Sequence, residues 1–114
     1  MEFELWENEN KVCYAGDFIK DQSSIVALKI TTLLEDISKF DFLVLLRKEK
    51  VKKIEKEIYE IRFKIQRDPY RFLFVIRKNK GWIVEAFKKK TNKTPRKYID
   101  NAKNRISSLD QQLK

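Results

Sequence analysis

Polar and apolar positions in the first forty residues predict a short strand followed by helices. Phe3 and Leu5 alternate with glutamates, which is typical of a strand, and we assign this strand to Phe3–Asn8. The segment Asp17–Gln22 suits one or two helical turns. A longer helix is expected to begin after an N-cap serine, Ser23 or Ser24, and to end near residue 39. Its apolar stripe has helical spacing: Val26, Ile30, Leu33, Ile37 and Phe40.

The pattern of residues 40–65 is ambiguous. Phe40–Leu46 is an apolar run that belongs in the core without a clear secondary structure. Five apolar residues between 51 and 65 have helical spacing, but Tyr59–Ile65 also alternates as a strand does. Because a turn sequence at Gln66–Pro69 leads into the aromatic and β-branched run of residues 70–78, we favour a β-hairpin.

The remaining chain predicts one more strand and a final helix. Asn79–Gly81 suits a three-residue hairpin loop with Gly81 in the left-handed conformation, followed by a strand over Trp82–Lys89. Thr94 is expected to cap a helix with Pro95 in its first position. The predicted fold is a single α+β domain over residues 1–114. An antiparallel sheet, formed by the N-terminal strand and a three-strand meander, packs one face against the N-terminal helices, and a C-terminal helix follows.

The meander is expected to have one apolar and one basic face. The apolar face comprises Tyr59, Ile61, Phe63, Ile65, Tyr70, Phe72, Phe74, Ile76, Trp82, Val84 and Ala86. On the other face, the predicted loops place Arg71 opposite both Lys89 and Lys64, with Arg62 on the diagonal. We therefore expect these four cations to gather on an open face, beside Phe87.

The charge distribution indicates a polyanionic partner, most simply nucleic acid. The formal net charge is +9; residues 1–46 hold 4 Lys and Arg against 9 Asp and Glu, whereas residues 47–114 hold 22 against 8. Solubility alone is the other explanation. The stretch Glu85–Tyr98 contains six cations and one acid, some of them at the expected start of the last helix. Cations there oppose the helix dipole but suit the binding of a phosphate.

Residue content limits the possible chemistry. The chain has no histidine and a single cysteine, which excludes Ser-His and Cys-His triads, ordinary zinc sites and an internal disulfide. Cys13 is expected to be a small, at least half-buried side chain. No metal or cofactor is predicted. No apolar run reaches the ~18 residues of a membrane span, and an acidic start argues against a signal peptide, so we expect a cytoplasmic protein.

Four motifs in order resemble the phage-derived HigB-like toxins of the RelE superfamily. They are Ile58–Arg62 (IYEIR), Tyr70–Phe74 (YRFLF), Phe87–Pro95 (FKKKTNKTP) and Ala102–Arg105 (AKNR). The resemblance covers about residues 58–109. The glycine that usually precedes the first motif in this family is missing here.

The resemblance implies a RelE-like fold and the toxin of a type II toxin–antitoxin pair. Such a toxin is an endoribonuclease that cleaves mRNA in the ribosomal A site. Its partner is a HigA-like helix-turn-helix antitoxin, through which alone it reaches operator DNA.

The motif match also implies residue roles in metal-independent attack by the RNA 2′-OH. Arg62 and Arg71 would stabilise the scissile phosphate, and Lys89 or Lys90 would act as base or second cation. Phe87 would stack on a base. Further RNA contacts are expected from Lys64, Lys88, Lys93, Arg96 and Lys97.

Two other classes of function stay open from the sequence. A non-catalytic RNA- or ribosome-binding module, such as a degenerate toxin, also needs the basic face. A purely structural protein needs neither RNA binding nor convergence of the cationic side chains.

Overall fold

The computed structural model describes residues 1–114 as a five-stranded sheet with four helices. The sheet has the order β1-β5-β4-β3-β2, in which β1 is parallel to β5 and all other neighbours are antiparallel. Its strands are β1 (Glu2–Leu5), β2 (Val51–Glu55), β3 (Ile58–Ile65), β4 (Asp68–Arg77) and β5 (Lys80–Lys88). The helices are α1 (Tyr14–Lys20), α2 (Ser24–Ile37), α3 (Phe42–Arg47) and α4 (Arg96–Gln112).

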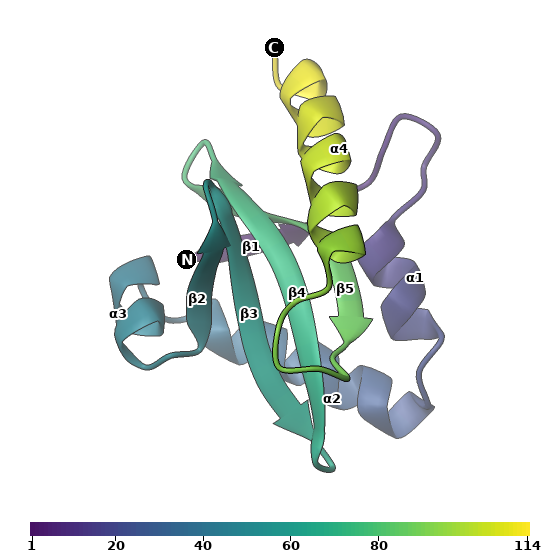
Figure 1. Cartoon of the computed structure of the whole chain (residues 1–114), viewed down its shortest axis with the longest axis vertical. Coiled ribbons are helices and arrows are strands. Elements are labelled where there is room, and N and C mark those ends of the chain that lie inside the picture. The colour runs from purple at the N-terminus through teal and green to yellow at the C-terminus, as the bar shows by residue number, and fades with distance from the viewer.

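Helices cover both faces of the sheet. In Figure 1, α2 passes behind the strands, whereas α4 lies in front of them. The predicted α+β class, with N-terminal helices and a C-terminal helix, is confirmed. The expectation of an open second face is wrong, because this face carries its own apolar patch. Leu73, Val75 and Phe87 pack there with the α4 stripe formed by Ile99, Ala102, Ile106 and Leu109.

The face toward the N-terminal helices holds the larger core. Thirteen buried apolar residues form one cluster there, including Ile30 of α2 and Phe72 and Phe74 of β4, which are all fully buried. Phe18 of α1 meets the Phe72 ring edge-on, with the ring centroids 6.1 Å apart. The amphipathic stripe predicted for α2 therefore buries as expected, apart from its last residue, Phe40, which is 40% exposed.

Two-residue turns join β3 to β4 and β4 to β5. Gln66 and Arg67 have φ of 53° and 75°, and Lys78 and Asn79 have φ of 53° and 62°. Positive φ at both central residues matches the twist of a hairpin. The predicted three-residue loop is thus wrong, and Gly81 has no positive φ. Gly81 lies within β5, where a Cβ atom would come 2.6 Å from the Phe3 ring.

Strand β2 was not predicted from the sequence. Its residues Val51 and Ile54 share helical spacing with the isoleucines of β3, and this hid the strand character of Val51–Glu55. In the structure β2 pairs with β3, and the turn between them places Glu57 at a φ of 66°. The strand assignment of Tyr59–Ile65 is confirmed.

A register shift in the β4–β5 pairing changes which side chains share a face. Phe74 pairs with Ile83, whereas the next residue back, Leu73, pairs with Glu85, so that Val84 is an extra residue in the manner of a β-bulge. Consequently Ile83 joins the N-terminal core, whereas Trp82 and Val84 lie with α4. The predicted faces of these three residues are wrong, because alternation fails across a bulge.

The helix ends follow local hydrogen bonds. The Ser23 hydroxyl accepts a hydrogen bond from the Val26 amide at 3.2 Å and caps α2, as predicted. The predicted cap of the last helix is wrong: α4 begins at Arg96, and the Thr94 hydroxyl bonds elsewhere. None of the four helices combines the length and the apolar character needed to cross a bilayer.

Candidate functional site: a cationic cleft between the sheet and the last helix

A polar cleft of about 340 Å³ opens beside the start of α4. The connection between β5 and α4 runs across the near side of the sheet and forms one wall, while β2 and β3 form the other (Figure 1). The lining residues are Lys52, Lys53, Ile54, Glu60, Arg62, Lys89, Asn92, Lys93, Thr94 and Ile99. Five of these ten side chains are cationic and one is a carboxylate, so the cleft suits an anionic ligand.

Glu60 is the buried centre of this cleft. Its residue is 1% exposed, and each carboxylate oxygen has a different neighbour. Oε2 accepts a hydrogen bond of 2.6 Å from the Thr94 hydroxyl. Oε1 lies 3.2 Å from Nε of Arg71 and 3.8 Å from Nε of Arg62. A buried carboxylate is costly unless it is paired and hydrogen-bonded, and this one is both.

Arg62 and Arg71 pair directly across β3 and β4, rather than diagonally as predicted. Arg62 reaches the cleft and keeps about a third of its side chain exposed. Arg71 is 8% exposed and its Nη1 donates to the Tyr70 carbonyl at 2.9 Å. Burial lowers the pKa of Arg71; the attraction of Glu60 opposes this effect, and the repulsion of Arg62 adds to it. Arg71 thus lies beneath the cleft rather than in it.

Lys89 stands at the end of β5, where the strand meets the cleft. Its amide donates to the Pro69 carbonyl at 2.8 Å, which fixes the backbone one residue beyond β5. Burial lowers the pKa of the Lys89 ammonium, and the charges of Arg71, Arg62 and Lys52 lower it further, against the opposing effect of Glu60. A lysine in this position gives up its proton more readily than an exposed one. The predicted pair Arg71–Lys89 across the strands is wrong: Arg71 faces Phe87.

Lys93 also lines the cleft, as do seven residues for which the sequence predicted no role in a site, Lys52, Lys53 and Asn92 among them. Lys52 and Lys53 come from β2, and Asn92 precedes Lys93. Residues 51–55 do not alternate as a strand does, because Val51 and Ile54 are three positions apart with both lysines between them. The sequence therefore held no clear signal that the two lysines lie on a strand.

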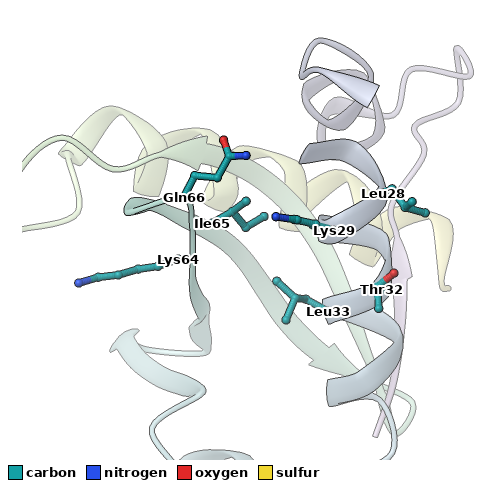
Figure 2. A pocket seen from close by; sticks show the side chains of 7 residues that line it. All are labelled: Leu28, Lys29, Thr32, Leu33, Lys64, Ile65 and Gln66. Carbon is teal, nitrogen blue, oxygen red and sulfur yellow. The ribbon is translucent and has the colours of Figure 1, made fainter. Parts of the chain in front are cut away.

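Phe87 and Lys64 lie away from the cleft. Phe87 is 2% exposed and stacks on Tyr98, with the ring centroids 3.9 Å apart. Its predicted place on an open face is therefore wrong, and in this conformation its ring is not available to a base. Lys64 borders a separate hollow between α2 and the end of β3, and Figure 2 shows it pointing away from α2.

The other predicted site residues lie around the cleft without lining it: Lys90, predicted as an alternative base or second cation, and the RNA contacts Lys88, Arg96 and Lys97. Lys88 pairs with Asp68 at 3.0 Å, and this contact raises the pKa of Lys88. Lys90 is exposed beyond the end of β5. Arg96 binds Glu55 at 3.2 Å and Asp100 at 3.1 Å, which raises its pKa, mainly through Glu55. The ammonium of Lys97 lies 4.9 Å from the Tyr98 ring centroid. Lys90 and Lys97 add positive charge at this end of the molecule, whereas carboxylates balance the charges of Lys88 and Arg96.

Fold and site together define a class: a small basic α+β protein whose cationic cleft is built around one buried carboxylate. The chain belongs to the family described as phage derived protein Gp49-like (DUF891), whose model matches residues 17–107. This is a toxin-like family of the RelE/HigB type, which confirms the sequence resemblance at that level. Comparison with curated proteins gives no match, and comparison with solved structures gives none either.

Proposed function

We propose that the protein is the toxin of a type II toxin–antitoxin pair, a HigB-like endoribonuclease that cleaves mRNA in the ribosomal A site. The observation that carries this proposal is the convergence of Arg62, Lys89 and Lys93 on one cleft. The lowered pKa of Lys89 within this group adds a candidate base. Membership of a toxin-like, phage-derived family supports the same conclusion.

The proposed reaction needs no metal. The neutral amine of Lys89 takes the proton of the RNA 2′-OH, and the oxygen attacks the adjacent phosphorus while the bond to the 5′-oxygen breaks. The leaving oxygen receives a proton from an ammonium group on the β2 wall of the cleft, that of Lys52 or Lys53, and the products end in a 2′,3′-cyclic phosphate and a 5′-hydroxyl. Arg62 stabilises the charge that builds on the phosphate oxygens. Arg71 acts from beneath through Glu60, and Lys90 and Lys97 contribute long-range attraction.

The partners follow from the same proposal. Ribosome-bound mRNA is the substrate, so the protein acts in the cytoplasm. A HigA-like helix-turn-helix antitoxin neutralises the toxin and carries it to operator DNA.

The test compares cleavage on ribosomes programmed with a defined mRNA. The double variant Arg62→Met with Lys89→Met is matched by Lys20→Met with Lys39→Met, which removes two exposed cations outside the cleft. We expect the wild type and the control to produce new 5′-hydroxyl ends, and the cleft variant to lose at least roughly 100-fold in rate. Equal cleavage by both double variants would contradict the assignment of the cleft.

One observation favours a second candidate, the non-catalytic RNA- or ribosome-binding module. Arg71, a residue of the family motif, is buried and paired with Glu60, so it cannot touch a substrate in this conformation. This candidate predicts that the folded wild type binds programmed ribosomes with a steep salt dependence but leaves the mRNA intact.

A further inference from the structure

The connection between β5 and α4 is tied to the sheet by a side chain that the sequence assigns to a helix cap. Thr94 directly precedes Pro95, the N-cap residue of α4, and that cap makes no side-chain hydrogen bond. The Thr94 hydroxyl instead donates to Oε2 of Glu60, 34 residues away, at 2.6 Å. A hydrogen bond to a buried carboxylate is stronger than one between neutral groups.

The rest of this connection has few other ties. Lys90, Thr91, Asn92 and Lys93 are exposed, and the Thr91 hydroxyl donates only within the connection, to the Lys93 carbonyl at 2.7 Å. Segments with few buried contacts open locally at low cost. The bond from Thr94 therefore decides how closely this lysine-rich segment lies against β3.

The other oxygen of Glu60 serves the two arginines. Arg62 and Arg71 are direct cross-strand neighbours, an arrangement that repels, and Oε1 lies within 4 Å of Nε of both. The same carboxylate attracts Lys89. One buried charge thus lets cations from β3, from β4 and from the first residue after β5 approach each other.

We propose that Glu60 is the positioning residue of the cleft: Oε2 holds the lysine-rich connection in place through Thr94, while Oε1 aligns Arg62 over Arg71. The two oxygens act separately. Loss of the Thr94 hydroxyl frees the connection and leaves the arginines aligned. Loss of the carboxylate charge leaves an acceptor for Thr94 but withdraws the shared counter-ion. This inference rests on the proposed function only where cleavage is measured.

The first experiment does not depend on activity. Limited trypsin digestion followed by mass spectrometry measures cutting after Lys89, Lys90 and Lys93. We expect Thr94→Val to be cut there roughly tenfold faster than the wild type, the factor that one charged hydrogen bond supports. Thr94→Ser restores slow cutting because it keeps the hydroxyl, and Thr32→Val, an exposed threonine of α2, changes nothing. Cutting of Thr94→Val at the wild-type rate, with an unchanged Tm, would overturn the proposal.

The second experiment separates this proposal from the proposed function. In the ribosome assay, Thr94→Val is expected to raise KM roughly tenfold with little change in kcat, because the connection carries substrate-binding cations. Glu60→Gln is expected to lower kcat instead, since it removes the counter-ion that aligns Arg62; if it does not fold, Thr94→Val still decides. An unchanged KM in Thr94→Val would overturn the positioning role. A wild-type protein that never cleaves mRNA would contradict the proposed nuclease activity, but the positioning role would still be tested by the trypsin experiment.

Discussion

The two faces of the sheet differ in the kinds of side chain that they bury. The face toward α1 and α2 buries only apolar side chains, thirteen of them in one cluster. The α4 face buries ten apolar residues, and all three buried charged residues of the chain lie there as well: Glu60, Arg71 and Glu85. Glu85 is compensated by Arg105 at 3.1 Å and by the Asn101 amide at 3.0 Å.

The difference indicates that one face of the sheet mainly stabilises the fold, whereas the other also positions charged side chains. Apolar packing stabilises a fold without placing any polar group, and the N-terminal face buries no charged residue. Buried charges cost free energy, but they fix the positions of their partners. The cleft lies on the charged face beside the start of α4, where Arg62 remains partly exposed and Arg71 does not.

The largest effect on stability is expected for a substitution in the apolar face. Phe72 is fully buried and contacts Phe18 and Phe63 through its ring. We expect Phe72→Ala to lower the free energy of unfolding by about 3–5 kcal/mol, because it leaves a cavity in a packed core. Urea denaturation measures this loss. A cost below about 1 kcal/mol would mean that this face does not carry the stability assigned to it.

The next effect tests the charged face. Arg71→Met leaves the buried Glu60 without its nearest cation and is expected to cost about 3 kcal/mol of unfolding free energy. The double variant Arg71→Met with Glu60→Met removes both charges and is expected to be more stable than the single one. A double-mutant cycle built on urea denaturation measures the coupling. Strictly additive costs would contradict a direct interaction between the two residues.

Substitution of Lys89 should separate activity from stability. Lys89→Met removes the proposed base and is expected to slow cleavage by roughly 100-fold. In the wild type, cleavage is expected to rise with pH as the Lys89 amine loses its proton, and to do so below the pH at which an ordinary lysine titrates. The pH–rate profile on ribosomes checks this; a flat profile in the wild type argues against Lys89 as the base.

Lys89→Met is expected to slow cleavage but to raise the stability of the folded protein at neutral pH. The pKa of Lys89 is lower in the folded than in the unfolded chain, so the folded state binds fewer protons between these two values. Wild-type stability therefore rises with pH through that window. At neutral pH, Lys89→Met should have the higher Tm, and its advantage should shrink as the pH rises. A lower Tm for the variant at every pH would show that Lys89 is held by favourable contacts instead.

The smallest effect concerns the hairpin tip, away from both faces. Arg67 has a φ of 75°, a conformation in which most side chains are strained. Arg67→Gly is expected to stabilise the fold by a few tenths of a kcal/mol, because relief of strain slightly exceeds the entropy gained by the unfolded chain. Thermal denaturation measures it, with Arg67→Ala as the control that removes the side chain but not the strain. Equal Tm values for the two variants would contradict this explanation.

Much of the fold could be predicted from periodicity. The stripe of α2 and the alternation of β3 each identified an element and its buried side. The bulge at Val84 could not be predicted, because an extra residue leaves no trace in an alternating pattern. The two-residue turns were also missed, since Gln66–Arg67 and Lys78–Asn79 lack the Asn-Gly sequence that usually marks them.

The site was predictable in part. Arg62, Lys89 and Lys93 were expected to act on one ligand and do line one cleft. Arg71 and Phe87 were placed on an open face because nothing in their local sequence tells whether α4 covers them. Glu60 was given no role, since its burial depends on a contact with Thr94 from a distant segment.

The parallel pairing of β1 with β5 bears on how the protein is made. Residues 2–5 leave the ribosome long before their partners, residues 80–83. Pairing over such a separation is slow, because the chain must lose loop entropy before any contact compensates it. A nascent chain therefore lacks a complete sheet until residues 80–83 emerge, and Thr94 emerges later still. An incomplete chain that lacks residues 80–99 has no assembled cleft, so any activity requires that this segment has first emerged.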